Sequence, residues 1–121
     1  MIDAGHAAIG IEVASGSPFT NVDHIFMTPE NAEKLWIELY RKERGGVMVT
    51  SGSYTGTGSD QDLNLAGLPF NHAFSIEHAI ELTKDDGEKV RLLMVRNPWG
   101  LETYKGNYSD SDLNWTDSML E

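Results

Sequence analysis

Residues 72–95, with the sequence HAFSIEHAIELTKDDGEKVRLLMV, decide the fold of this 121-residue chain. Apolar and polar side chains alternate along residues 72–82 and again along residues 90–95, which is typical of half-buried β-strands. The polar segment 84–87 lies between the two runs and has the composition of a turn. The pattern therefore predicts an antiparallel β-hairpin.

The register of this hairpin determines which side chains meet at its open end. With the turn centred between Lys84 and Asp85, His72 lies opposite Asn97, because opposing residues of an antiparallel pair have a constant index sum. Trp99 follows two positions later. The sequence therefore predicts a histidine, an asparagine and a tryptophan side by side where the strands become loops.

An asparagine amide beside a histidine suggests acid–base chemistry. We expect the side-chain oxygen of Asn97 to accept the Nδ1–H of His72, so that Nε2 faces a nucleophile. We expect the Trp99 indole to shield that hydrogen bond from water. This arrangement is the base half of a thiol-protease site. The alternative, which the pattern alone leaves open, is that His72 and Asn97 are only polar residues at strand ends.

A helix is predicted over residues 29–44. Thr28 is a good N-cap residue, and Pro29 suits the first helical position, where its missing N–H costs nothing. One face of this helix is apolar, formed by Ala32, Leu35, Trp36, Leu39 and Tyr40. Residues 45–46, both glycine, end it.

Three further segments complete the expected architecture. Residues 47–50 are predicted as a short buried strand, residues 4–14 as a short helix, and residues 98–121 as loop with a helical turn. The fold class is therefore α+β: a twisted antiparallel sheet, partly barrel-like, with the helix at 29–44 packed against it.

The composition excludes several functions. The chain carries 19 acidic and 9 basic residues, a net charge of −10, and such a surface repels the phosphate backbone of nucleic acids. It contains no cysteine, which excludes a disulfide scaffold, a thiolate metal site and a cysteine nucleophile within these residues. No apolar run approaches the roughly 20 residues that cross a bilayer, so no transmembrane segment is predicted.

Several motifs give the chain a resemblance to a known family. Residues 71–76 read Asn-His-Ala-Phe-Ser-Ile, residues 96–100 read Arg-Asn-Pro-Trp-Gly, and an aromatic, glycine-containing run follows at 104–110. The calpain family of cysteine proteases has Gly-His-Ala-Tyr-Ser, then Arg-Asn-Pro-Trp-Gly at a similar distance, then an aromatic run. The helix at 29–44 and the strand after it also match, and the chain therefore resembles this family.

The resemblance implies the second lobe of a papain-like protease core. In calpains the first lobe carries the nucleophilic cysteine, and the second carries the histidine and asparagine. Residues 1–18 would then be the tail of the first lobe or a linker, and residues 19–121 the second lobe of a longer protein. His72 would be the general base, Asn97 the residue that orients it, and Trp99 a shield that lines the cleft. The isolated chain would be inactive because it lacks the cysteine.

The resemblance also raises calcium as a cofactor of the parent protease. Asp110 occupies the position of one family calcium ligand, whereas Thr103 stands at another and has no carboxylate. Calcium prefers about six to eight oxygen ligands, so one matched carboxylate does not make a complete site.

The function implied is the histidine- and asparagine-bearing lobe of a calcium-dependent cysteine endopeptidase that cuts intracellular proteins. Its partners would be protein substrates and the cysteine-bearing lobe. The N-terminus has no targeting signal, so we expect an intracellular, cytoplasmic location. One alternative is a non-catalytic calpain-like binding or scaffolding module, and another is an acidic calcium-binding domain. The presence of His72, Asn97 and Trp99 together favours the enzyme, because a structural module has no need for all three.

Overall fold

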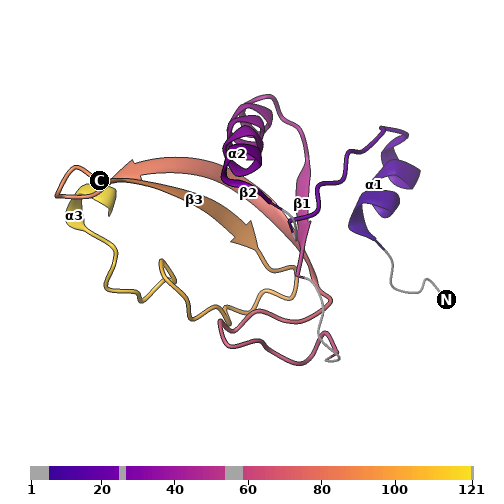
Figure 1. Ribbon diagram of the computed structural model, residues 1–121. Helices are drawn as coiled ribbons and strands as arrows, with labels where there is room; N and C mark the ends of the chain where they lie inside the picture. The colour runs from indigo at the N-terminus through magenta and orange to yellow at the C-terminus, as the bar shows by residue number, and fades with distance from the viewer. Residues whose placement is uncertain (1–5, 25–26, 54–58, 121) are drawn as a thin grey trace.

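The computed structural model describes residues 6–24, 27–53 and 59–120. Within these ranges, the elements in chain order are α1 (Ala7–Ser15), α2 (Pro29–Arg44), β1 (Val49–Gly52), β2 (Ala73–Thr83), β3 (Lys89–Arg96) and α3 (Asp117–Leu120). The strands form one antiparallel sheet in the order β1-β2-β3 (Figure 1). The α+β class is confirmed, and the described strands form an open sheet rather than a closed barrel.

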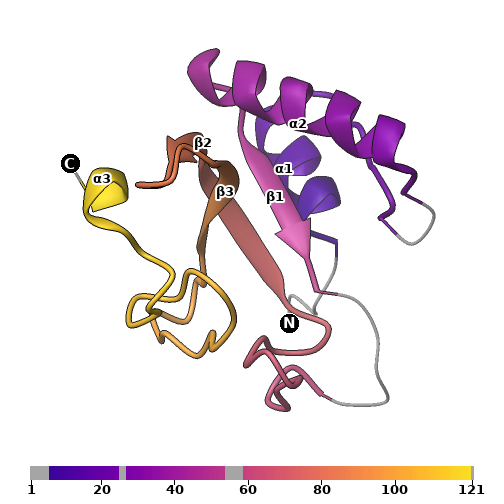
Figure 2. The same cartoon turned by 60° about the vertical axis from the view of Figure 1, so that its left-hand side comes forward.

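The helix α2 begins and ends at the residues that the sequence predicts. The Thr28 hydroxyl accepts the backbone N–H of Asn31 at 3.2 Å, as an N-cap does. At the other end, Gly46 has a φ of +70°, a conformation that glycine adopts at little cost. The helix packs against β2 on one side of the sheet (Figure 2).

An ionic cluster joins α2 to β3. Arg91 donates hydrogen bonds to Glu33 of α2 and to Glu81 of β2, and its guanidinium carbon lies 5.3 Å from the ring centre of Trp36. Lys89 also pairs with Glu81, at 2.8 Å. These side chains are partly solvent-accessible, so the cluster contributes only modestly to the stability of the fold.

The hairpin of β2 and β3 forms, but with a register that differs from the prediction. Thr83 pairs with Lys89, whereas the predicted turn would have paired it with Asp86. At the open end Ser75 pairs with Arg96, the last pair of the ladder. Asn97 therefore lies beyond the paired region and not directly across from His72.

The tip of the hairpin accounts for this difference. The backbone N–H of Lys84 donates to the carbonyl of Glu88 at 2.8 Å, so Lys84 still belongs to the paired region and the loop is residues 85–87. Gly87 has a φ of +86°, the left-handed conformation that a short hairpin loop requires at such a position. The turn is thus centred on Asp86, further along the chain than predicted.

A β-bulge interrupts β2 between Ile76 and His78. Ile76 pairs with Val95, and His78 pairs with Met94. Because consecutive residues of β3 point to opposite faces, Ile76 and His78 also point to opposite faces. The simple alternation expected along β2 is therefore broken. Strict alternation would have placed His78 on the same face as His72, but the two residues lie on opposite faces.

The buried core is small and lies along β2. Phe74, Ala79 and Met119 are its buried apolar side chains among the described residues, and Pro69 is fully buried. Phe74 and Ala79 differ by an odd number of positions, yet the bulge places both on one face of the sheet. That face is the one from which His72 also emerges.

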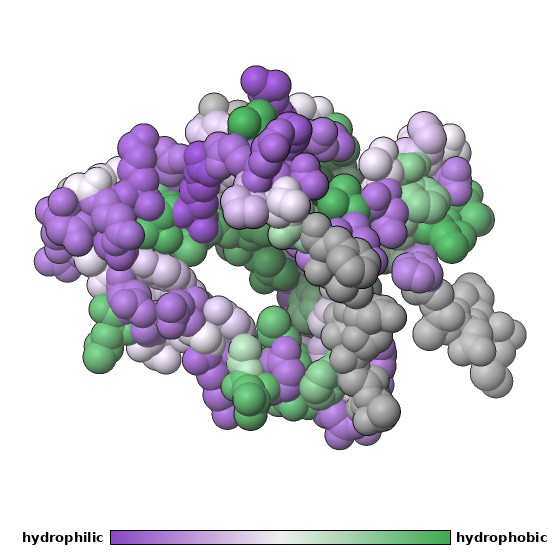
Figure 3. Space-filling model, viewed as in Figure 1, coloured by the Kyte–Doolittle hydropathy of each residue, from purple (hydrophilic) through white to green (hydrophobic). Residues whose placement is uncertain are grey.

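The C-terminal segment runs back from the open end of the hairpin to its tip, where α3 packs against β2 (Figure 1). The Ser118 hydroxyl donates to the carbonyl of Thr83 at 2.9 Å, and the Ser118 N–H donates to a carboxylate oxygen of Asp85 at 3.1 Å. An opening with apolar side chains on its upper edge separates this segment from the sheet (Figure 3).

The helix α1 lies beside the sheet (Figure 2). Its bounds are similar to those of the short helix predicted over residues 4–14. It ends at Gly16, which has a φ of +70°. Its apolar side chains are largely exposed, including Val13, of which 82% is accessible. In the part of the chain that the structure describes, no helix is long and apolar enough to cross a membrane.

Candidate functional site

His72 and Asn97 form a direct hydrogen bond at the open end of the hairpin. The Nε2 atom of His72 lies 2.9 Å from the side-chain oxygen Oδ1 of Asn97. Because Oδ1 is an acceptor, Nε2 carries the proton and donates it. The predicted contact between the two residues is confirmed. The prediction that Nδ1 makes this bond was wrong, since Asn97 lies off the strand end and the ring reaches it with its more distal nitrogen.

The turn at residues 97–100 holds the Asn97 amide in one orientation. Its Oδ1 also accepts the backbone N–H of Trp99 at 3.0 Å, and its Nδ2 donates to the carbonyl of Leu101 at 3.4 Å. The N–H of Gly100 closes the turn on the carbonyl of Asn97 at 3.0 Å. Pro98 fits the second position of such a turn. The amide therefore presents its oxygen, and not its NH₂ group, to the histidine.

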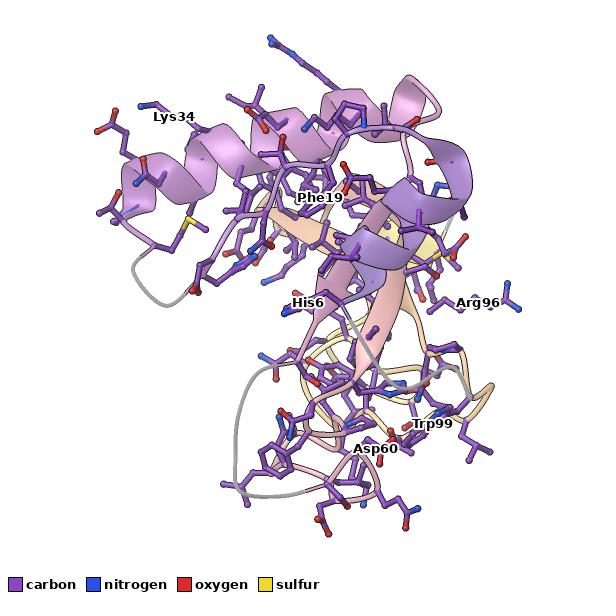
Figure 4. All side chains as sticks on the ribbon, turned by 90° about the vertical axis from the view of Figure 1, so that its right-hand side faces the viewer. His6, Phe19, Lys34, Asp60, Arg96 and Trp99 are labelled. Carbon is purple, nitrogen blue, oxygen red and sulfur yellow. The ribbon has the colours of Figure 1, made fainter. Side chains whose placement is uncertain are left out.

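Two aromatic rings enclose the His72 imidazole. The ring centre of Trp99 lies 4.2 Å away with the planes tilted by 49°, and that of Phe74 lies 4.9 Å away in an edge-to-face contact. Only 8% of His72 is accessible to solvent, whereas 44% of Trp99 is accessible. The indole thus covers the imidazole and faces solvent on its other side. Figure 4 shows Trp99 among the loops at this end of the sheet and Arg96 pointing away from the protein.

The backbone of His72 is held by Ser53, a residue that no motif or periodicity in the sequence marks. The Ser53 hydroxyl accepts the N–H of His72 at 3.1 Å, and the Ser53 N–H donates to the carbonyl of His72 at 2.9 Å. Ser53 follows β1 directly, in a segment rich in glycine and serine without periodicity. A correct prediction of how β1 pairs with β2 would have identified Ser53, because this pairing places Ser53 beside His72.

Asn71 gives the chain an unusual conformation directly before His72. Its φ is +48°, in the left-handed region that most residues avoid but asparagine tolerates. Glycine adopts such a φ more readily, so Asn71 holds a position that favours glycine or asparagine.

The loop before His72 packs closely on the segment after Trp99. The side-chain oxygen of Asn64 accepts the N–H groups of Ala66 and Leu68 at 2.9 and 3.0 Å. The N–H of Lys105 donates to the carbonyl of Ala66 at 2.8 Å. A β-carbon on Gly67 would lie 1.9 Å from the carbonyl oxygen of Thr103, so only glycine fits there. The two segments that flank the site therefore support each other.

The predicted calcium ligand Asp110 is exposed. It lines a shallow depression together with Ser111, Asp112, Trp115 and Leu120. Hydrogen bonds from the Asn114 side chain and from the Tyr108 backbone N–H lower the pKa of Asp112, whose carboxylate is thus already used within the loop. No group of three or more metal-ligating side chains is assembled among residues 6–24, 27–53 and 59–120.

Known proteins resemble this chain along most of its length. The family model described as "Calpain family cysteine protease" matches residues 1–120. The calpain-1 catalytic subunit of Mus musculus is 33% identical over 73 residues, which cover 60% of this chain and 10% of that protein. Calpain-9 of Homo sapiens is 27% identical over 108 residues, covering 88% of this chain and 16% of that protein. The chain thus spans about a tenth to a sixth of the length of these relatives.

Proposed function

The chain belongs to the calpain family of cysteine proteases, and on that basis we propose that it supplies the histidine and asparagine of a papain-like endopeptidase core. The observation that carries this proposal is the hydrogen bond of 2.9 Å from Nε2 of His72 to Oδ1 of Asn97. Under this proposal, residues 1–18 are the tail of the first lobe or a linker, and residues 19–121 form the second lobe.

His72 acts as the general base and then as the general acid. With Nε2 donating to Asn97, Nδ1 is the nitrogen that takes the proton of the cysteine thiol on the first lobe, which leaves a thiolate and an imidazolium. The thiolate attacks the carbonyl carbon of the peptide bond. The imidazolium then gives its Nδ1 proton to the departing amine, and water releases the acyl group from the cysteine.

Asn97 and Trp99 keep His72 ready for both proton transfers. The Asn97 oxygen holds Nε2–H in every protonation state, so the ring does not turn when Nδ1 gains or loses its proton. The Trp99 ring, 4.2 Å from the imidazole, limits the access of water to this bond. The chain contains no cysteine, so by itself it should not hydrolyse peptide bonds.

We expect the substrates to be proteins inside the cell, cut in extended segments. Calcium is proposed as a cofactor of the complete protease. On this chain Asp110 is the candidate ligand, and it would need further oxygen atoms from outside the described residues.

A hybrid protein tests the proposed function. The chain is joined behind the cysteine-bearing first lobe of a calpain, and casein hydrolysis is measured with calcium and with a chelator. We expect hydrolysis that requires calcium and that is abolished by His72→Ala. His78→Ala is the matched control, because His78 lies in β2, six residues after His72, and points to the opposite face of the sheet. This variant should leave the rate unchanged.

Two outcomes would contradict the proposal. Equal hydrolysis by the hybrid and its His72→Ala variant would remove His72 from the mechanism. A folded hybrid that does not cleave casein would favour the non-catalytic calpain-like module instead.

A further inference from the structure

We infer that Ser53 is a positioning residue for His72, which fixes the backbone from which the imidazole projects. The inference rests on the proposed function for its catalytic consequence. The geometry on which it stands is independent of that function, since every contact lies within this chain.

Ser53 extends the pairing of β1 with β2 by one unusual step. The last named pair of the two strands is Gly52 with Ala73, and the N–H of Ser53 then donates to the carbonyl of His72 at 2.9 Å. In a regular hydrogen-bonded pair, the N–H of His72 would return a bond to the carbonyl of Ser53. Here the Ser53 side-chain oxygen takes that place, at 3.1 Å. The side chain thus completes the ladder where the strand ends.

The same Ser53 hydroxyl also donates a hydrogen bond to the backbone carbonyl of Pro69. Ser53 Oγ lies 2.5 Å from the carbonyl oxygen of Pro69 and 3.2 Å from that of His72, so its single proton is donated principally to Pro69. Pro69 is fully buried. One serine oxygen therefore connects Pro69 and His72, and it bridges the tight bend that contains Asn71.

This bridge matters because it spans a bend that contains a residue with positive φ. Asn71 has a φ of +48°, in the left-handed region that most residues with a β-carbon avoid and that asparagine adopts with local support. Without the hydroxyl, the N–H of His72 and the buried carbonyl of Pro69 both lose a partner, and Asn71 can relax toward negative φ. Such a relaxation redirects the Cα–Cβ bond of His72 and pulls Nε2 away from Asn97.

The His72 residue is accordingly held from two sides. Ser53, next to β1, holds its main chain, whereas Asn97, after β3, holds its ring. Ser53 is thus the contribution of the edge strand β1 to the site, although its side chain does not contact the imidazole in any described interaction.

Nuclear magnetic resonance on the 121-residue chain tests this role. With ¹⁵N-labelled histidine, the unaltered chain should show His72 as the Nε2–H tautomer, with this proton protected from solvent exchange. In Ser53→Ala we expect its exchange to become at least about tenfold faster, with a mixture of both tautomers. Ser53→Thr keeps the hydroxyl and should restore the protected signal.

Ser118→Ala is the matched control for a general loss of stability. It removes a hydroxyl that donates to the backbone of β2 at 2.9 Å, but at Thr83, the far end of the strand. This variant should unfold at a lower urea concentration while the His72 signal is unchanged. If Ser53→Ala does not fold, Ser53→Cys, which keeps the side-chain size with a much weaker donor, replaces it in the same comparison.

Two results would overturn the inference. One is that the Nε2–H proton of His72 is as well protected in Ser53→Ala as in the unaltered chain. Where Ser53→Cys replaces Ser53→Ala, the same comparison applies to it. The other is an equal loss of protection in Ser118→Ala. In the hybrid protease, Ser53→Ala should lower kcat about tenfold with KM unchanged. Because the resonance measurement needs no cysteine and no substrate, its failure refutes the positioning role alone, whereas an inactive hybrid refutes only the proposed function.

Discussion

The two ends of β2 are built in different ways. At the open end, His72 is buried, enclosed by two aromatic rings and hydrogen bonded through both its ring and its backbone. At the tip, Lys84 forms an ion pair with Glu88, turn hydrogen bonds join the backbone, and the Asp85 carboxylate accepts the N–H of Ser118. The site thus lies where the geometry is fixed by close packing, and the far end is held by contacts that water can replace.

The largest difference is expected between two glycine substitutions. Gly67→Ala places a β-carbon 1.9 Å from the carbonyl oxygen of Thr103, so the loop must separate from its neighbour, at a cost of about 4 kcal/mol. Gly87→Ala at the tip meets no atom within 4 Å and costs only about 1 kcal/mol, for its positive φ. Urea denaturation of both variants measures the two free energies. Equal losses would contradict the contrast between the two ends.

Asn97→Ala should reduce the activity of the hybrid protease strongly. It removes the acceptor of the Nε2–H of His72 and frees the ring to rotate, for which we expect a loss of about 100-fold in kcat. Asn107→Ala serves as the control in casein hydrolysis, because Asn107 is exposed and contributes a backbone carbonyl to Tyr104. A loss below twofold, about the scatter of such rates, would show that the ring needs no anchor.

Strong acid should loosen the tip of the hairpin. Hydrogen bonds from the Ser118 side chain and backbone lower the pKa of Asp85. The stabilisation from Asp85 is therefore complete above its ordinary pKa and is lost as the pH falls through the lowered value. Amide exchange near Ser118 should accelerate over that range, and Asp85→Asn should flatten the dependence. An unchanged pH profile in Asp85→Asn would contradict the assignment.

The smallest effect is expected from the ionic cluster on α2. The pKa of Glu33 is lowered, mainly by its hydrogen bond from Arg91. Both groups are accessible, so salt screens their attraction and Glu33→Gln should barely change the urea midpoint at high ionic strength. A large loss that persists at high salt would show that α2 depends on this ion pair for its position.

The parts of the fold that local signals specify could be predicted from the sequence. Thr28 and the glycines at 45–46 mark the ends of α2, and the bounds of this helix follow from them. The hairpin was also predictable as an element. Its register was not, because the three-residue loop and the bulge after Ile76 shift the pairing without leaving a clear mark in the hydrophobic pattern.

The residues of the candidate site could be predicted from the sequence, but the residues that hold them in position could not. The contact between His72 and Asn97 survives the wrong register, because the turn after Arg96 carries Asn97 back toward the histidine. Which ring nitrogen makes the bond depends on that turn, and the sequence alone does not determine it. Ser53 lies in a segment without periodicity, so only the pairing of β1 with β2 reveals its contact.

The bulge in β2 has a consequence for how this sequence can change in length. Ala79 and His72 are separated by an odd number of positions and share a face only because the bulge takes up one residue. Deleting Glu77 would restore a regular strand and turn the imidazole to the opposite side of the sheet, away from Trp99. An insertion or deletion at the hairpin tip leaves that side unchanged. Variation in length is therefore tolerated at residues 85–87 and forbidden in the middle of β2.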